Sequence, residues 1–179
     1  LTVSGTTLLS TTGTILTAGT GLLSITGTSA GTLSHFSAGT VRLEDSGLDQ
    51  LGATGTNAYI EVGGDATYGT IVNTSGALVL RSTDIHNYIT VTNGISNAGT
   101  IDYSSASSTA YLTNVTLTNG SLENTGLFHF DTPSTQGHQF VGDVDNSGTI
   151  MLVETGNLTF SNASGTFLNS GLIDIDDEG

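Results

Sequence analysis

Short runs of alternating apolar and polar residues recur along the chain, and each run follows a small polar turn that contains Gly. The copies are NSGTIML (146–152), NAGTIDY (97–103), NTGLFHF (124–130), NSGLIDI (169–175) and SAGTVRL (37–43). Because side chains alternate between the faces of a strand, the apolar residues of each copy share one face. The predicted inward pairs are Val41 and Leu43, Ile101 and Tyr103, Phe128 and Phe130, Ile150 and Leu152, and Ile173 and Ile175. The residues between them, such as Arg42, Asp102, His129 and Asp174, are predicted to face solvent.

The turn before each run predicts a corner of the chain. We expect its Gly to adopt a positive φ, which a residue with a side chain adopts at a cost. The clearest corners are expected at Gly13, Gly39, Gly69, Gly99, Gly126, Gly148 and Gly171. Their spacing of 22 to 30 residues is typical of one coil in a β-solenoid. An Asn precedes several corners, and stacked amides are predicted to form a ladder through Asn97, Asn124, Asn146 and Asn169.

The pattern therefore predicts an all-β chain that folds as a right-handed parallel β-helix of about six to eight coils. Residues 1–179 are expected to form a single segment of a larger repetitive protein. Second strands are predicted in GALVL from Gly76, YLTNVTLTN from Tyr111 and GNLTFSN from Gly156. Residues 44–69 and 131–143 are expected to loop out of the stack, because they hold charges, several Gly and the single Pro.

A β-sandwich is the main alternative fold, since short strands at regular spacing also describe one. Tight hairpins would favour it, but Asn93-Gly94 and Asn119-Gly120 are the only Asn-Gly pairs, and Asp-Gly is absent. The same short motif also recurs with its apolar residues at the same positions after the Gly. These two observations favour the solenoid.

The charge and the amino-acid composition exclude several classes of partner and chemistry. The net charge is −14, and the only fixed cations are Arg42 and Arg81, so nucleic acid and anionic membrane surfaces are unsuitable partners. The absence of Cys removes disulfides and thiol chemistry. No apolar run approaches the roughly 20 residues that a membrane helix needs, so membrane insertion is not expected.

The repeats NAGTIDY, NTGLFHF, NSGTIML and NSGLIDI resemble the degenerate coils of filamentous-haemagglutinin-like adhesins and autotransporter passenger domains. The resemblance covers about residues 37–175 and is one of repeat style. It implies a bacterial surface protein with a right-handed β-helix, export from the cell, an elongated shape, and an adhesive or structural role. It assigns no functional residue.

One motif suggests a metal. Residues 143–154, DVDNSGTIMLVE, match the spacing of a calcium loop, with Asp143, Asp145 and Glu154 as its acids. The sequence on both sides is strand-like, whereas an EF-hand needs helices, so only a looser Ca²⁺ site at Asp143 and Asp145 is predicted. The terminal DIDDE (174–178) could bind Ca²⁺ weakly or form a solvated surface. Calcium is the one cofactor that the sequence suggests.

No catalytic residues are predicted. Polysaccharide lyases on β-helices need a basic residue to handle an acidic sugar, and this chain has two Arg and no Lys. The four His, His35, His86, His129 and His138, have no ligand spacing. The prediction is a non-catalytic structural or adhesive segment of a secreted cell-surface or extracellular fibre protein. It is expected to associate with its own copies, end to end or side by side, and a surface glycan is its candidate ligand. The alternative is a carbohydrate-binding or carbohydrate-cleaving β-helix.

Overall fold

A computed structural model describes the chain at residues 2–4, 8–10, 22–26, 30–34, 38–44, 47–53, 57–63, 65–82, 86–105, 112–131, 137–153, 157–162 and 165–176. These residues form strands and short turns, and the described ranges contain no helix. The scarcity of helix formers and the abundance of β-branched Thr, Val and Ile account for this. The described part accordingly holds no helix that is long and apolar enough to span a membrane.

The strands form two sheets. The first sheet has nine strands in the order β1 (Thr2–Ser4), β3 (Leu22–Thr26), β5 (Ala38–Glu44), β7 (Asn57–Gly63), β9 (Ala77–Ser82), β12 (Thr100–Ser105), β14 (Leu127–Asp131), β16 (Thr149–Val153) and β19 (Leu172–Asp176). The second has ten strands: β17 (Asn157–Ser161), β15 (Gly137–Asn146), β13 (Leu112–Asn124), β10 (His86–Val91), β8 (Ala66–Asn73), β6 (Leu48–Ala53), β4 (Ala30–Ser34) and β2 (Leu8–Ser10), joined by β11 (Ile95–Asn97) beside β13 and β8 and by β18 (Phe167–Asn169) beside β15.

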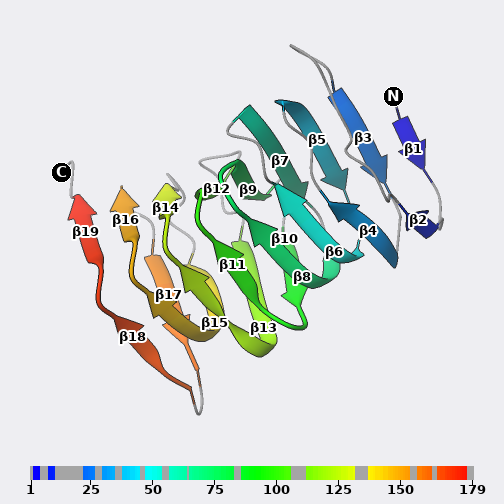
Figure 1. The fold of residues 1–179 in the computed structure, drawn as a ribbon. Coiled ribbons are helices and arrows are strands. Elements are labelled where there is room, and N and C mark those ends of the chain that lie inside the picture. The colour runs from blue at the N-terminus through cyan, green and yellow to red at the C-terminus, as the bar shows by residue number, and fades with distance from the viewer. Residues whose placement is uncertain are drawn as a thin grey trace.

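The chain alternates between the two sheets, and neighbouring strands within each sheet run parallel, as β12 does with β9 and β14. Figure 1 shows the two rows of strands stacked along one axis, with the chain ends at opposite ends of the stack. This arrangement confirms the predicted β-solenoid. It rules out the sandwich of antiparallel hairpins. The number of coils differs slightly from the expected six to eight, and the right-handed sense of the coil stays a prediction.

The core lies between the sheets and contains most of the predicted inward pairs. Val41, Leu43, Ile101, Tyr103, Phe128, Phe130 and Ile150 are all buried, and Leu152 packs against them. They superpose in register, since Ile101 pairs with Leu78 and with Phe128 on its two sides. Each buried large side chain contributes about 1.5 to 3 kcal/mol. Ile173 and Ile175 lie in register with the inward residues Ile150 and Leu152 of β16. They are nevertheless 39% and 71% exposed, because β16 is the one described strand that pairs with β19.

Aromatic rings fill the core near the C-terminal end of the stack. The Tyr103 ring centroid lies 5.4 Å from that of Phe130, and the Phe140 centroid lies 5.8 Å from that of Phe160. Phe128 bridges the sheets, since its ring meets Phe140 edge-on at 6.0 Å. These pairs add specific ring contacts to the area that they bury.

The predicted amide ladder is present and is one rung longer than expected. Each side-chain amide donates to the side-chain oxygen of the next coil, from Asn73 to Asn97 (2.9 Å), to Asn124 (2.7 Å), to Asn146 (2.6 Å) and to Asn169 (2.6 Å). Asn73, Asn97, Asn124 and Asn146 are buried. Successive rungs are 24, 27, 22 and 23 residues apart in sequence, which is the length of these coils.

The role predicted for the corner glycines is wrong in its mechanism. Within the described residues the glycines with positive φ are Gly94, Gly120 and Gly142, and the corner glycines are not among them. A Cβ on Gly99, Gly126, Gly148 or Gly171 would instead strike the main-chain oxygen of the glycine one coil earlier. The corners need Gly because successive coils approach too closely there for a side chain.

The predicted coil boundaries need two corrections. Gly69 lies inside β8, and the corner of that coil is Gly76. Two residues separate Asn73 from Gly76, whereas one residue separates Asn from Gly in the other corners, so the repeat was not recognised there. GALVL consequently forms β9 of the first sheet rather than a second strand. YLTNVTLTN and GNLTFSN were predicted correctly, since β13 and β17 belong to the second sheet.

The two predicted loops are also largely strand. Residues 44–69 contain β6, β7 and the start of β8, which continue the stack. Of residues 131–143, those from Gly137 onward belong to β15, and residues 132–136 with Pro133 lie outside the described part. The prediction took charged and Gly-rich residues as a sign of loops. Each strand buries only alternate residues, so its outward positions tolerate polar side chains. The expected corner at Gly13 also lies outside the described residues.

Candidate functional site

The predicted calcium residues lie on the second sheet, near the end of β15. Asp143 is half-buried and Asp145 is exposed. One carboxylate oxygen of Asp143 accepts hydrogen bonds from the side-chain amide of Asn162 and from the main-chain N–H of Thr166 (2.8 Å). These bonds connect Asn162 and Thr166 to the preceding coil, which gives Asp143 a structural role.

Strands rather than helices flank this motif, as its sequence indicated. Its residues run from β15 through the corner at Gly148 into β16, and Glu154 lies outside the described part. Among the residues that the structure describes, no group of three or more His, Asp or Glu side chains converges as a metal site would require. Asp174 is exposed on β19, and residues 177–179 of the acidic tail lie outside the described part. Calcium binding at Asp143 and Asp145 stays a prediction.

The four His residues are not brought together. His129 faces outward from β14, as predicted, and its Nδ1 lies 3.4 Å from a carboxylate oxygen of Asp102 in the neighbouring coil. His138 is buried in the core, where its ring lies edge-on to Tyr103 and Phe130. His86 begins β10, and His35 lies outside the described residues.

Burial changes the acid–base behaviour of this core pair. It lowers the pKa of His138 and raises the pKa of Tyr103, because an apolar surrounding disfavours the charged form of each group. Both groups therefore stay neutral near pH 7. Tyr103 is 0% exposed, so neither the charge nor the access that general acid–base catalysis requires is found at this ring.

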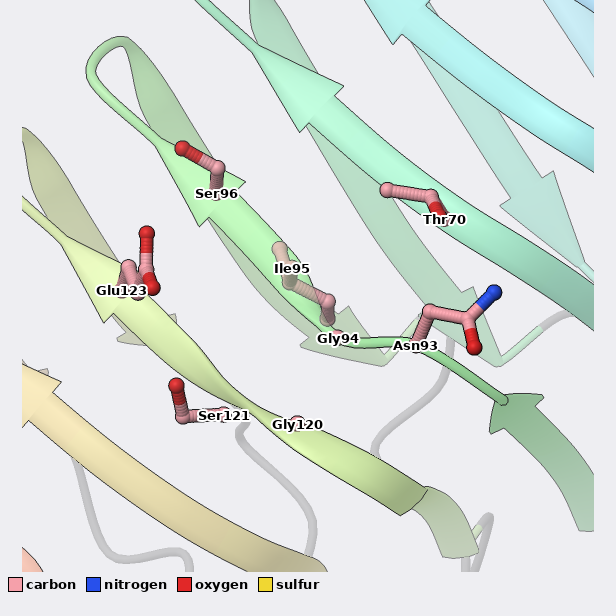
Figure 2. A pocket seen from close by; sticks show the side chains of 8 residues that line it. All are labelled: Thr70, Asn93, Gly94, Ile95, Ser96, Gly120, Ser121 and Glu123. Carbon is pink, nitrogen blue, oxygen red and sulfur yellow. The ribbon is translucent and has the colours of Figure 1, made fainter.

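A groove on the outer surface of the second sheet is the candidate functional site. It has a volume of about 220 Å³. Its walls come from three consecutive coils. They are β8 with Thr70, the bend between β10 and β11 with Asn93 to Ser96, and β13 with Gly120, Ser121 and Glu123. Figure 2 shows the side chains of Asn93, Ser96 and Glu123 around this hollow.

Two glycines create the bend beside the groove. Gly94 and Gly120 have φ values of 102° and 81°, in the left-handed region that favours Gly. The second sheet changes direction there, since β10 ends at Val91 and β11 starts at Ile95, and the pairing of β13 with β15 shifts between Thr116 and Ser121. The groove lies at this bend.

Sequence analysis missed this groove, although a signal for it was present. The dipeptides Asn93-Gly94 and Asn119-Gly120 were considered only as hairpin turns. In the structure they are stacked in adjacent coils, where the N–H of Asn119 donates to the main-chain oxygen of Thr92 (2.9 Å). Asn-Gly pairs that recur one coil apart, here offset by one residue because Gly94 lies beside Ser121, indicate a repeated bend rather than a hairpin.

The fold and the groove define the class of protein as a parallel β-solenoid repeat protein with a polar surface groove. Comparison with protein-family models, with curated proteins and with solved structures found no match.

Proposed function

We propose that this chain is a non-catalytic structural or adhesive segment of a secreted bacterial cell-surface or extracellular fibre protein. The observation that carries the proposal is the amide ladder from Asn73 to Asn169, which joins five coils by side-chain hydrogen bonds within an unbroken parallel stack. Such a stack is a stiff spacer in which every coil supports its neighbours. The repeat style that resembles bacterial surface adhesins supports an extracellular location.

Charge supports the non-catalytic role. A net charge of −14 with two Arg and no Lys leaves little with which to bind an acidic polysaccharide substrate. The carboxylates of Asp143 and Asp145 lie two residues apart on one strand, and Asp143 is held by Asn162 and Thr166. This arrangement is unlike the facing pair across a cleft that glycoside hydrolysis uses.

The experiment combines shape and activity. Electron microscopy of the purified chain should show short rods, and incubation with a polysaccharide panel should release no new reducing ends. A compact globule would contradict the spacer role. Release of reducing ends from any polysaccharide would contradict the non-catalytic role and support the alternative of a carbohydrate-cleaving β-helix.

A further inference from the structure

The groove on the second sheet lies at a bend whose central residue, Gly94, has no room for a side chain. Ile95 pairs with Ile71 on one side and with Leu122 on the other, so Gly94 lies between Thr70 and Ser121 in the outward row. A Cβ on Gly94 would come within 2.7 Å of the main-chain oxygen of Ser121. Both the positive φ and the close backbone of Ser121 therefore require Gly at position 94. The bend beside the groove thus depends on this residue.

The lining offers hydrogen bonds rather than apolar or cationic contacts. Hydroxyl groups come from Thr70, Ser96 and Ser121, an amide comes from Asn93, and a carboxylate comes from Glu123. Hydroxyl and amide groups donate and accept, whereas the carboxylate only accepts. Among the lining residues that the structure describes, none is aromatic and none is Arg. A matching ligand must carry several O–H donors.

The surrounding charge selects against anions. Glu123 lies in register with exposed Asp145 of the next coil. The two arginines lie on the other sheet, Arg42 in β5 and Arg81 in β9. An acidic sugar would meet repulsion without a compensating cation. An uncharged sugar meets no such penalty.

We propose that this groove binds one uncharged sugar ring of a glycan, with the ring hydroxyls donating to Glu123 and exchanging hydrogen bonds with Asn93, Ser96 and Ser121. The volume of about 220 Å³ suits a single small polar ring, because sites for drug-sized ligands hold about 300 to 1,000 Å³. The inference rests on the adhesive role proposed above and adds the place of binding and the class of sugar.

The test uses saturation-transfer NMR and titration with methyl glycosides of neutral hexoses, with a methyl glycoside of a uronic acid, and with a polyamine. Saturable binding of a neutral glycoside with a Kd of about 1 mM is expected, and weaker or absent binding of the uronate. Ser96→Phe should fill the groove and weaken binding by at least about tenfold. Glu123→Gln should weaken it several-fold without a change in shape. Asp174→Asn, an equivalent loss of charge on the other sheet, should have no effect.

Three results would overturn the groove as a sugar site. They are the absence of saturable binding by every neutral glycoside, binding of the uronate or the polyamine in preference to them, and neutral-sugar binding that persists unchanged in folded Ser96→Phe and Glu123→Gln. Failure of this kind leaves the non-catalytic spacer role intact, since that role fails on particle shape and on the release of reducing ends.

Discussion

Asparagine side chains at the corners of the coils donate hydrogen bonds to one another and to main-chain oxygens of the adjacent turns. Asn124 is 0% exposed, and its amide nitrogen lies within hydrogen-bond distance of Asn146 Oδ1 (2.6 Å) and of the main-chain oxygens of Gly126 (3.3 Å) and Thr149 (3.1 Å). The side-chain oxygen of Asn124 accepts a hydrogen bond from the side-chain amide of Asn97 (2.7 Å). Amides in such a row polarise one another, which strengthens each bond.

Replacing Asn124 by Ala should lower the free energy of unfolding by about 3 kcal/mol, since a buried group that loses its partner costs about 1 to 3 kcal/mol. Urea denaturation measures the change. Asn119→Ala is the matched control, because Asn119 is exposed, and it should cost less than about 0.5 kcal/mol. Equal losses in the two variants would show that the ladder adds nothing to stability.

Gly126→Ala tests the close approach at the corners. Its new Cβ would strike Gly99 and Ala98 of the preceding coil, so the stack must open locally. We expect a loss of about 1 to 3 kcal/mol in denaturant unfolding, the usual range for overpacking. Ser147→Ala, at an exposed corner residue, should be nearly neutral. A neutral Gly126→Ala would contradict the explanation that contact requires Gly.

His138 gives the fold a dependence on pH. It is 1% exposed, and its ring centroid lies 5.8 Å from that of Tyr103 and 5.4 Å from that of Phe130. Burial lowers its pKa from the ordinary 6.5, so the folded chain resists a proton that the unfolded chain accepts. The stability from neutral His138 is therefore complete above pH 6.5 and is lost as the pH falls toward its folded-state pKa.

The free energy of unfolding of the wild type relative to His138→Gln should therefore fall from about pH 7 to about pH 5, by at most about 1.4 kcal/mol per pH unit. Denaturant titrations of both proteins at each pH measure the difference, and the carboxylates common to both cancel. Parallel curves would mean that His138 titrates alike in the folded and unfolded chains.

At the scale of elements, one coil is the unit that can be removed. Asn124 and Asn146 occupy equivalent ladder positions 22 residues apart, and β15 pairs with β13 on one side and with β17 and β18 on the other. Each strand contacts chiefly its two neighbours in the stack. The stability of such arrays is close to a sum of coil terms and neighbour terms.

Deletion of residues 125–146 should therefore give a folded, shorter solenoid, because it joins Asn124 to Ser147 and restores an Asn-Ser-Gly corner. We expect a β-sheet circular dichroism spectrum and cooperative unfolding at a lower denaturant concentration. Deletion of β14 alone (Leu127–Asp131) removes one strand without its coil and should prevent folding. Loss of structure in the first deletion would show that the coils are not interchangeable units.

At the scale of the whole molecule, the C-terminal end of the stack exposes apolar side chains. Phe167, Leu168, Leu172, Ile173 and Ile175 are between 39% and 71% exposed, on the last strands of the two sheets. Among the described strands β19 pairs with β16 alone, so no described strand covers its other edge. Strand edges of this kind pair readily with another chain.

We predict that this chain associates with its own copies once salt screens its charge of −14. At about 0.15 M salt the screening length is about 8 Å, which weakens long-range repulsion and leaves contact at the end of the stack intact. Sedimentation velocity across a salt series should show growing oligomers. Ile175→Asp should suppress them, whereas Val72→Asp, the same change at a partly exposed site in mid-stack, should not. A monomer at high salt and high concentration would contradict this prediction.

The sequence by itself determined the fold class, the inward pairs such as Ile101 and Tyr103, and the ladder from Asn97 to Asn169. These features depend on alternation and on repetition, which are local in sequence and are preserved from coil to coil. Only the tertiary structure decided the coil at Gly76, the strands within residues 44–69, the steric role of the corner glycines and the groove beside Gly94. Each of these depends on which residue of one coil lies above which residue of the next. Coil lengths vary between 22 and 27 residues along the ladder, so that register is set by the stacked backbones and not by any single stretch of sequence.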